Sequence, residues 1–419
     1  MLRPVGTLHP PLYIPQKAVL VGGAVRDLLL GRKPLDLDLL AKDPKGQAEE
    51  AASRLGGRFF PLDEERGLYR VVAGGLTLDF APLLDLEKDL LSRDFRLNAM
   101  ALVNGVVLGP FGVERDLKER RLQVIREENL YQDSLRSLRG VRLAVTLGLG
   151  LGPASREMLK RHAHHLQAHP EAQPAPERVQ SELERILLSP RAAYGFWLME
   201  RLGLLQVYLP ELARTKRVEQ LGRHFLDVFD HSLCVLFHLL FLKPDAPLAL
   251  RLAALLHDLG KATTQSWDEV KGRYRFLGHE RESARLAEAL LLRLRFPKKI
   301  VERTEALILA HMHLPSPKAK RRFFLKHKDL LPDLLYLQAA DRLARMGGEA
   351  EAAPLLELAE EFLTAPPPQK PLLTGEEVMA LLGLSPGPEV GRALRRLLLA
   401  QAEGKVKSKE EAEAFLKGL

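Results

Sequence analysis

The first part of the chain, residues 17–125, alternates between short apolar runs and stretches of helical periodicity. The runs AVLVGG, DLDLL, LTLDFAPL and MALVNGVVL read as buried or half-buried strands. Between them, GQAEEAASRLGG places its apolar residues at helical spacing. This mixture predicts an α/β or α+β domain.

The pattern changes after residue 130, where the strand-like runs stop. Apolar residues recur at helical spacing through three long segments, 133–163, 177–208 and most of 217–363. Val179, Leu183, Ile186 and Leu187 illustrate this spacing. Proline-bearing breaks at 168–177 and 364–371 read as linkers, and the last stretch reads as short helices divided by glycine and proline. We therefore expect a multidomain protein, helical after its first domain.

Composition narrows the class of protein. A chain of 419 residues has room for two to four domains. Its one cysteine, Cys234, excludes a disulfide framework and a multi-cysteine zinc site. The N-terminus lacks the features of a signal peptide and no apolar run could span a membrane, so we expect a cytoplasmic protein. The net charge of +8 suggests a polyanionic partner without choosing between nucleic acid and acidic protein.

Two aspartates, Asp36 and Asp38, stand two positions apart in the leucine-rich run PLDLDLL. On a strand, this spacing brings both carboxylates to one face. Crowded acids repel unless cations lie between them, and a pair of magnesium ions is the usual solution in phosphoryl-transfer sites. Asp79, in LTLDF, suits the third carboxylate expected on a neighbouring strand. A solvated strand edge is the alternative for an isolated Asp-x-Asp.

The preceding segment, VGGAVRD, has the features of an anion-binding turn. Gly22 and Gly23 end a predicted strand and let backbone N–H groups at a helix N-terminus approach an anion closely. Arg26 lies in the first turn of that helix, where it can add a charge-assisted contact. Together with the paired acids, this turn predicts a nucleoside triphosphate held by metal against a reacting hydroxyl.

With these motifs the chain resembles a known family, the class II CCA-adding enzymes and bacterial poly(A) polymerases of the polymerase β nucleotidyltransferase superfamily. The matching blocks are LVGGAVRDLLLG with LDLDL, LEKDLLSRDFRLNAMAL, GPFGVERDLKERRLQVI and QDSLRSLRGVRLAVTLGL. ERVQSELERILLSPRAAYGFWLMERLGLL resembles the family's neck, and PGPEVGRALRRLLLAQAEGKV resembles its tail. The resemblance implies a polymerase β-like α/β (α+β) head, an all-α neck that recognises the base, a helical body and a helical, tRNA-binding tail, over 1–130, 131–215, 216–363 and 364–419.

The resemblance also implies residue roles in the head. The metal ligands for Mg²⁺ would be Asp36 and Asp38, with Asp79 as the third acid. The groups that hold the nucleotide and its triphosphate would be Gly22, Gly23, Arg26 and Arg93.

In the neck, Asp133 and Arg136 would read the base of CTP or ATP, with Arg139 close by on the same helix. A carboxylate accepts from the exocyclic amino group of cytosine or adenine, while a guanidinium donates to the adjacent ring acceptor. Uracil and guanine offer the opposite pattern, so no template is needed. A salt-bridged helix face is the alternative for these three residues.

The chain departs from the family's pattern in two places. Ser92-Arg93-Asp94 stands where Arg-Arg-Asp is common, and Gln132 stands where Glu is common. More important, the interval between Asp79 and Arg93 holds only FAPLLDLEKDLLS. Relatives that add the complete CCA carry a longer flexible segment there, whereas relatives that add only two cytidines are similar to this chain. The resemblance therefore implies a CC-adding enzyme that uses CTP, with full CCA addition from CTP and ATP as the alternative.

Histidines and aspartates in residues 231–341 form a second set of candidate ligands. ALLHDLGK resembles the signature of HD-domain metal phosphohydrolases, whose ligand order His…His-Asp…Asp is matched by His231, His257, Asp258 and Asp341. His279 and His311 fall where related domains place further ligands, and His313 is the alternative to His311. Ligands from separate helices imply a helical cage. The resemblance implies a divalent transition metal such as Ni²⁺, Mn²⁺ or Co²⁺; some relatives keep this fold without its chemistry.

Positive charge concentrates between residues 290 and 330, where eleven lysines or arginines face three acids. Such a run is compatible with a solvated face, but it could also track RNA phosphates. Phe323 and Phe324 would then be core or stacking groups. The RNA-binding candidates are Lys318, Lys320, Arg321 and Arg322 and, by resemblance to a tRNA-binding tail, Arg392, Arg395 and Arg396.

Three functions follow as hypotheses. The first is a tRNA 3′-end nucleotidyltransferase with an appended HD phosphohydrolase. The second is a poly(A) polymerase that extends RNA with ATP. The third is an RNA-binding HD phosphohydrolase without transferase activity.

Overall fold

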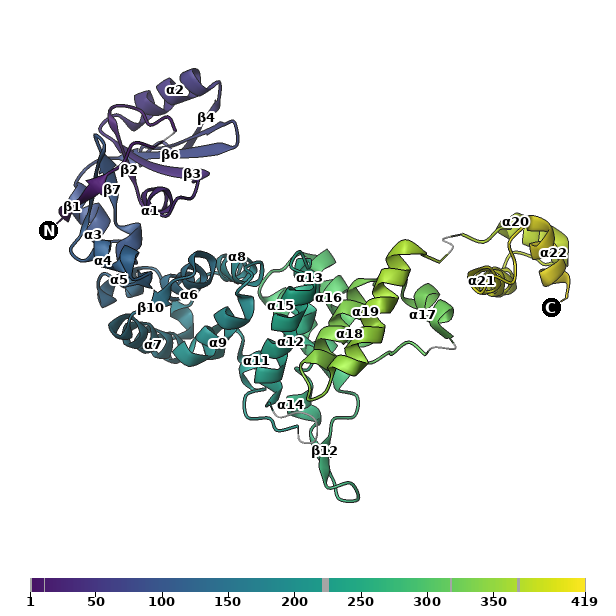
Figure 1. Ribbon diagram of the computed structural model, residues 1–419. Coiled ribbons are helices and arrows are strands. Elements are labelled where there is room, and N and C mark those ends of the chain that lie inside the picture. Colours follow the sequence, from purple (N-terminus) through teal and green to yellow (C-terminus); the bar gives the residue numbers. More distant parts are fainter. Residues whose placement is uncertain (1, 11, 221–225, 317–318, 368–369, 419) are drawn as a thin grey trace. The chain divides into compact units, whose positions relative to one another are not determined.

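The computed structural model describes residues 2–10, 12–220, 226–316, 319–367 and 370–418. The chain forms two compact units, Met1–Tyr208 and Leu209–Leu419 (Figure 1). The expected order of a mixed sheet domain followed by helices is confirmed. The finer division into four parts stays a prediction.

The first unit begins with an eight-stranded sheet in the order β1-β8-β7-β2-β3-β6-β5-β4. β3 and β6 run parallel, and the other neighbouring strands run antiparallel. The strands are β1 (Leu2–Thr7), β2 (Ala18–Val21), β3 (Asp36–Ala41), β4 (Arg58–Asp63), β5 (Leu68–Ala73), β6 (Leu76–Pro82), β7 (Ala101–Val103) and β8 (Val106–Pro110). The sheet domain also contains α1 (Gly23–Leu29), α2 (Pro44–Leu55), α3 (Leu86–Leu91), η1 (Arg96–Asn98) and α4 (Val113–Lys118).

The alternation along β3 places the two aspartates. Leu37 and Leu39 are each 1% exposed and face the core, so Asp36 and Asp38 point to the opposite, open face. β2 lies on one side of β3 and β6 on the other, which makes β3 a central strand. The carboxylates are therefore held on a rigid part of the sheet.

Helices complete the first unit. They are α5 (Glu127–Gln132), α6 (Arg136–Leu147), α7 (Pro153–Ala168), α8 (Pro176–Leu187), α9 (Ala192–Leu202) and α10 (Leu204–Tyr208), with η2 at Pro170–Ala172. Gly140 lets α6 approach the sheet domain closely, because a Cβ there would lie 2.7 Å from Cζ of Phe95. This contact brings the polar side of α6 toward the strands that carry the aspartates.

Three short strands of two small ribbons lie beyond residue 130 and depart from the expectation that strands stop there. β9 (Arg121–Leu122) pairs with β10 (Gly150–Leu151), and β11 (Ser266–Asp268) pairs with β12 (Arg273–Arg275). Each strand has only two or three residues, too few for a period-2 pattern to be recognised in the sequence.

The second unit is helical apart from the β11–β12 hairpin. Its body contains α11 (Pro210–Ala213), α12 (Val228–Leu242), α13 (Leu248–Leu256), α14 (Lys261–Thr264), α15 (His279–Arg293), α16 (Lys298–Ala310), α17 (Lys320–His327), α18 (Asp333–Leu343) and α19 (Glu349–Thr364). The tail, α20 (Gly375–Leu382), α21 (Pro388–Ala402) and α22 (Lys409–Lys417), has its own core around Leu373, Val378, Leu397 and Leu416. Among the described residues, no helix is both long and apolar enough to cross a bilayer.

Candidate functional site

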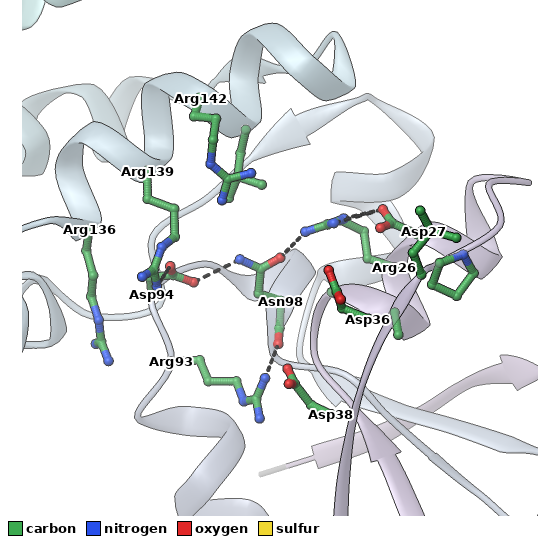
Figure 2. A pocket seen from close by; sticks show the side chains of 15 residues that line it. Arg26, Asp27, Asp36, Asp38, Arg93, Asp94, Asn98, Arg136, Arg139 and Arg142 are labelled. Atoms are coloured by element: carbon green, nitrogen blue, oxygen red, sulfur yellow. Dashed lines mark hydrogen bonds and ion pairs between the residues drawn. The ribbon is translucent and has the colours of Figure 1, made fainter. Parts of the chain in front are cut away.

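A cavity of about 410 Å³ opens beside β3 in the first unit (Figure 2). Its volume lies in the range of small-molecule sites. Strand β3 contributes Asp36 and Asp38, and α6 contributes Arg136, Arg139 and Arg142. The remaining polar lining comes from Arg26, Asp27, Arg93, Asp94 and Asn98. Five arginines facing a pair of carboxylates suit a polyphosphate bound together with cations.

The aspartates repel one another across neighbouring strands. Asp38 stands level with Asp79 in the parallel register of β3 and β6. Desolvation raises the pKa of Asp38, the guanidinium of Arg93 opposes this rise, and the charges of Asp79 and Asp36 add to it. A carboxyl whose ionised form is disfavoured in this way is ready to gain a cation. Asp36 and Asp38 therefore fit a divalent metal site.

Asp79 is held differently from the other two acids. Arg70, its cross-strand neighbour on β5, donates from Nε to Oδ1 at 2.7 Å and from Nη2 to Oδ2 at 2.8 Å. Asp79 does not line the cavity. This bidentate ion pair satisfies the carboxylate without a metal.

The predicted anion-binding turn, Gly22 to Arg26, is called the phosphate turn. It lies next to Asp38. Gly22 has φ of +81°, and a Cβ there would overlap the Arg93 guanidinium and come within 3.1 Å of the Asp38 carboxylate. Only glycine suits this backbone conformation and this close approach. Gly23 begins α1 and lines the cavity. Arg93 is steadied by Asp89, whose Oδ2 accepts from Nε at 3.1 Å.

A chain of hydrogen bonds runs from the phosphate turn to the neck helix α6. Arg26 donates to the side-chain oxygen of Asn98, and Asn98 Nδ2 donates to Asp94 Oδ1 at 3.0 Å. Asp94 is 3% exposed, and its other oxygen accepts from Arg139 Nη1 at 3.1 Å. Figure 2 shows these side chains side by side across the cavity. Arg26 also donates to Asp27 from Nε at 2.9 Å.

The predicted base readers are held by separate partners. Arg136 donates from Nη1 to the carbonyl oxygens of Ser92, at 2.8 Å, and Asn129, at 2.7 Å. Asp133 does not line the cavity, and its Oδ2 accepts from Arg178 at 2.9 Å. Burial acts to raise the pKa of Asp133, but this hydrogen bond and one from the Leu135 N–H outweigh it and lower the pKa.

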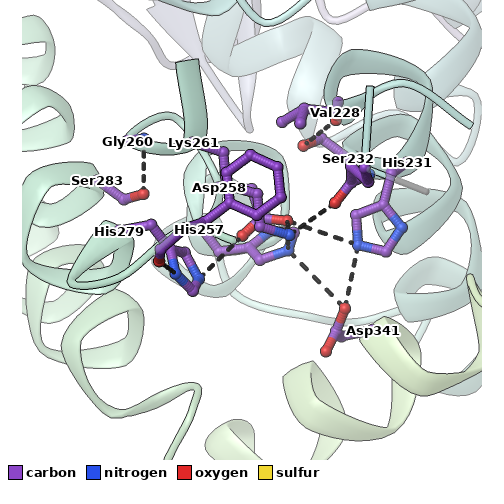
Figure 3. A network of polar contacts seen from close by, with 12 residues as sticks. Val228, His231, Ser232, His257, Asp258, Gly260, Lys261, His279, Ser283 and Asp341 are labelled. Atoms are coloured by element: carbon purple, nitrogen blue, oxygen red, sulfur yellow. Dashed lines mark hydrogen bonds and ion pairs between the residues drawn. The ribbon is translucent and has the colours of Figure 1, made fainter. Parts of the chain in front are cut away.

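A second polar cluster occupies the interior of the helical unit (Figure 3). It contains four histidines and two aspartates, none more than 7% exposed: His231, His257, Asp258, His279, His311 and Asp341. They form two groups of three potential ligands, one of His231, His257 and Asp341 and the other of Asp258, His279 and His311. The six residues come from α12, α15 and α18 and from the C-terminal ends of α13 and α16. His313 is exposed and lies outside both groups, so the geometry favours His311.

The histidine orientations suit metal binding. Nδ1 of His257, His279 and His311 each contacts the carbonyl oxygen three residues earlier, at 3.0, 2.8 and 2.6 Å. A carbonyl only accepts, so Nδ1 carries the proton and Nε2 is left with its lone pair. Burial, with the charge of His257, lowers the pKa of His311 to about 3, and burial also lowers the pKa values of His231 and His279. Neutral imidazoles of this kind are the ligand form.

His257 differs from the other histidines in its electrostatics. Burial acts to lower its pKa, but the carboxylates of Asp258 and Asp341 outweigh burial and raise it. Its Nε2 lies 3.2 Å from Asp258 Oδ2 and 4.0 Å from Asp341 Oδ1. A cation bound between these carboxylates would replace the proton of His257.

Two cations balance the aspartates, one buried, Lys261, and one partly buried, Arg345. Lys261 Nζ lies 2.7 Å from Asp258 Oδ2 and donates to Gln220 Oε1 at 2.7 Å, and Arg345 pairs with Asp341. Buried charges without such partners would cost several kcal/mol each.

Two relatives match nearly the whole length of this chain. A CC-adding tRNA nucleotidyltransferase of Thermus thermophilus is 61% identical over 409 residues, which cover 97% of this chain and 94% of that protein. An A-adding tRNA nucleotidyltransferase of Deinococcus radiodurans is 45% identical over 423 residues, or 97% of each chain. The chain belongs to the tRNA nucleotidyltransferase family.

The domain families and solved structures agree with this membership. The patterns of three families match the nucleotidyltransferase: "Poly A polymerase head domain" at residues 18–85, "Probable RNA and SrmB-binding site of polymerase A" at 148–216 and "HD domain" at 228–346. The crystal structure of the Bacillus stearothermophilus CCA-adding enzyme with CTP shares the fold, with a TM-score of 0.67 and 23% identity over 96% of this chain and 92% of that one. Family membership implies dependence on a divalent metal. The two groups of three potential ligands belong to the buried histidine–aspartate cluster, here called the HD cluster: His231, His257, Asp258, His279, His311 and Asp341. Asp36 and Asp38 of the cavity are a further candidate site with two carboxylates.

The structure brings some predicted residues of the nucleotidyltransferase together and leaves others apart. Gly23, Arg26, Asp36, Asp38, Arg93, Arg136 and Arg139 line one cavity, whereas Gly22, Asp79 and Asp133 lie beside it. Sequence reasoning missed Asp27, Asp94, Asn98 and Arg142 as lining residues. Their signals were present, because Arg142 follows Arg139 by three positions on one helix face and Asp94 follows Arg93 directly.

The predicted RNA-binding residues of the nucleotidyltransferase have mixed surroundings. Lys320 and Arg321, on α17, pair with Glu361 of α19 at 2.9 and 3.5 Å, whereas Arg322 is exposed. Lys318 lies outside the described residues. Phe323 and Phe324 are buried and belong to the core. The last three candidates share one exposed side of α21, where they stand three and four positions apart: Arg392, Arg395 and Arg396.

Proposed function

We propose that this nucleotidyltransferase adds cytidines to the 3′ end of tRNA and stops before the terminal adenosine. The cavity that holds Asp36, Asp38 and five arginines carries this proposal, because it offers sites for cations, a triphosphate and a base within one wall of side chains. In the reaction, the 3′-hydroxyl oxygen forms a bond to the α-phosphorus of CTP, the bond from that phosphorus to the β-phosphate oxygen breaks, and pyrophosphate leaves. The hydroxyl proton passes to solvent.

The chain's own residues divide this work. Asp36 and Asp38 would hold Mg²⁺, which when bound activates the attacking hydroxyl and stabilises the leaving oxygen. Arg26, Arg93 and the N–H groups at the start of α1 orient the triphosphate. Asp79 is proposed as the third acid on the strength of its register with Asp38, although this role requires its release from Arg70.

Base choice is assigned to α6. Arg136 and Arg139 line the cavity and donate toward the ring acceptors of cytosine, and Asp133 would accept from its amino group. The proposal requires Asp133 to exchange its bond with Arg178 for the base. The hydrogen-bond chain from Arg26 to Arg139 ties the triphosphate position to the base position.

The restriction to cytidine rests on the segment between β6 and Arg93. Relatives of both specificities match the whole chain, so overall similarity does not choose between them. Residues 83–92 consist of three linking residues, the six-residue helix α3 and Ser92. Asp85 caps the start of α3, because its Oδ1 accepts a hydrogen bond from the Lys88 N–H at 3.0 Å. No room remains there for a long flexible segment, which supports CC addition.

The deciding experiment incubates the protein with tRNA that lacks its 3′ end, together with CTP and ATP. The expected product ends in two cytidines, and Asp36→Ala with Asp38→Ala abolishes its formation. A product with terminal adenosine overturns the restriction. Extension of generic RNA by ATP alone would instead identify a poly(A) polymerase.

A phosphohydrolase is a second function, favoured by the six buried ligands of the HD cluster. Their division into two groups of three suits two divalent cations. Mixed imidazole and carboxylate ligands favour Mn²⁺, Co²⁺ or Ni²⁺ over Mg²⁺. When bound, such ions lower the pKa of water for attack on a phosphoester. The substrate proposed is a phosphorylated RNA end.

Metal analysis of the purified protein, followed by His257→Ala and Asp258→Ala, tests the second function. Both substitutions are expected to remove bound transition metal and phosphodiesterase activity while cytidine addition persists. Unchanged hydrolysis in both variants would remove the assignment. Loss of the proposed transferase by Asp36→Ala with Asp38→Ala should leave hydrolysis intact, which separates the two sites.

The RNA surface is proposed on α17 and α21. Arg322, Arg392, Arg395 and Arg396 are exposed, whereas Lys320 and Arg321 would first have to leave Glu361. Charge reversal of Arg395 and Arg396 is expected to weaken tRNA binding and to reduce its dependence on salt.

A further inference from the structure

The β11–β12 hairpin stands at the HD cluster and has no role in the functions proposed above. It occupies the interval between Lys261, which contacts Asp258, and His279, a potential ligand of the second group. In Figure 1 it extends beyond the helices from which it arises. Its residues 265–278 read QSWDEVKGRYRFLG.

The hairpin presents an ordered aromatic pair to solvent. Trp267 and Tyr274 are direct cross-strand partners, and their rings meet edge to face with centroids 5.0 Å apart. Trp267 nevertheless remains 44% exposed. An aromatic ring fixed by a neighbour and open on its other side suits stacking against a planar group, which costs little ordering entropy.

The turn between the strands is pre-organised; it contains Glu269 and Lys271, and Arg273 begins the strand that follows. Asp268 Oδ1 accepts from the N–H groups of Val270 and Lys271, each at 3.2 Å, and Gly272 has φ of +56°. Lys271 and Arg273 are exposed, and no acid lies within ion-pair distance of either among the residues that the structure describes. Arg275, by contrast, lies 3.9 Å from Asp268. The unpaired cations suit phosphate groups.

The base of the hairpin is connected to the potential metal ligands through the chain and through side-chain contacts. β12 ends at Arg275, and His279 follows four positions later. The Phe276 carbonyl oxygen accepts a hydrogen bond from Nδ1 of His279 at 2.8 Å. The Phe276 ring lies 5.4 Å from Lys261 Nζ. The base of the hairpin therefore contacts a potential ligand, His279, at one end of the interval and the ion-pair partner of Asp258, Lys261, at the other.

We propose that the β11–β12 hairpin is the recognition arm of the HD site and binds a nucleotide at the phosphorylated 3′ end of RNA. The base stacks on Trp267, Lys271 and Arg273 contact the backbone phosphates, and the terminal phosphoester faces the cluster. The aromatic ring selects a nucleotide over a bare phosphoester. This proposal rests on the phosphohydrolase function.

The experiment compares two substrates of the manganese-loaded full chain. One is a short oligoribonucleotide with a 2′,3′-cyclic phosphate, and the other is glycerol 1,2-cyclic phosphate, which has no nucleobase or other aromatic ring. Trp267→Ala is expected to raise KM for the oligonucleotide at least tenfold, while kcat and the hydrolysis of the second substrate stay unchanged. Trp267→Phe should restore most of the affinity. Charge reversal by Lys271→Glu, in the turn and outside the paired strands, should raise the same KM.

Trp197 offers a matched control. It lies in the first unit on α9, is 43% exposed and stacks on Tyr194 with centroids 5.5 Å apart, so Trp197→Ala removes an equally exposed, equally partnered ring. This variant should leave both hydrolytic reactions unchanged. Equal KM values for the oligonucleotide in the wild type, Trp267→Ala and the charge-reversed variant would overturn the proposal. The hairpin would then be a binding surface for a protein partner instead.

A binding measurement tests nucleotide recognition by the hairpin independently of the hydrolase activity. In a Trp197→Phe background, fluorescence reports Trp267 alone, since the chain has two tryptophans. Quenching by the oligonucleotide that disappears in the charge-reversed variant supports recognition even if neither substrate is hydrolysed, in which case the hydrolase function fails alone. Absence of quenching overturns the recognition arm even if hydrolysis is observed.

Discussion

Asp94 of the sheet domain and Arg139 of α6 form an ion pair, with Oδ2 and Nη1 3.1 Å apart. The Arg139 side chain is partly buried in the cavity wall and 30% exposed. Burial acts to lower its pKa, but the carboxylates of Asp94, Glu182 and Asp133 outweigh burial and raise it. The ion pair thus fixes the place of the guanidinium relative to Asn98 and Arg26.

Replacing Asp94 by Asn should therefore impair transfer without removing any group from the phosphate turn. The amide keeps an acceptor for the Phe95 N–H, which Asp94 accepts at 2.8 Å, but loses the charge opposite Arg139. We expect kcat/KM for CTP to fall between about ten- and a hundredfold, because a hydrogen bond between charged groups contributes ~1.5–3 kcal/mol. Steady-state addition to truncated tRNA measures this. Asp63→Asn, at the partly exposed end of β4 in the same domain, serves as the control, and equal activity of the two variants would contradict the role of the pair.

Asp79 should matter less to catalysis than Asp38. Arg70 already neutralises Asp79 with two hydrogen bonds, whereas Asp38 faces the cavity with a raised pKa. We expect Asp38→Asn to lower kcat by at least about a thousandfold and Asp79→Asn by about a hundredfold or less, because Asp79 has to leave Arg70 before it can serve as the third acid. Single-turnover transfer at saturating Mg²⁺ compares them. An unchanged rate in Asp79→Asn would mean that Asp79 stays paired with Arg70 and is not the third acid.

The sequence supports the prediction of site residues wherever the signal is local. Period-2 alternation along PLDLDLL is enough to place Asp36 and Asp38 on one face of a strand, and helical spacing is enough to place Arg136 beside Arg139. The HD motif likewise predicts the ligand types, and the structure brings all six predicted residues into one interior cluster. These are short-range properties of strands, helices and adjacent residues.

Partners from distant segments could not be predicted in the same way. The ion pair of Asp79 depends on the register of β5 against β6, and that of Asp94 depends on how α6 approaches Phe95 across Gly140. The basic run gives a clearer case, because Lys320 and Arg321 meet Glu361 of a helix that follows about forty positions later. Charge along a sequence does not show which charges are paired in the fold.

Lys261 should separate metal binding from hydrolysis in the HD cluster. Its Nζ lies 2.7 Å from Asp258 Oδ2, where it competes with cations for the carboxylate. In the proposed hydrolysis its charge would stabilise the negative charge that develops on the substrate phosphate. Lys261→Met is therefore expected to tighten Mn²⁺ binding several-fold while kcat for phosphodiester hydrolysis falls by about tenfold or more. Titration calorimetry and turnover measure the two effects. Lys298→Met, an exposed lysine of the same unit, should change neither, and weaker metal binding in Lys261→Met would assign the lysine to the positioning of Asp258.

His162 should make the stability of the neck helices depend on pH. The side chain is 0% exposed, its Nδ1 lies 2.6 Å from Ser137 Oγ, and burial, with the charge of His165, lowers its pKa from 6.5 to about 4. The unfolded chain therefore takes up a proton at higher pH than the folded chain does. The stability that neutral His162 provides is fully present above pH 6.5 and is lost as the pH falls from 6.5 toward about 4. Between about pH 7 and pH 5 the loss should be ~2 kcal/mol.

Guanidinium unfolding at both pH values measures this loss. In a Trp267→Phe background the signal comes from Trp197 on α9, a helix that packs against the α7 helix of His162. His162→Gln can keep a hydrogen bond to Ser137 but cannot titrate, so its free energy of unfolding should change less between the two pH values than that of the parent. His164→Gln, an exposed histidine two positions along the same helix, should behave like the parent. If the two substitutions flatten the pH dependence equally, the buried imidazole is not its source.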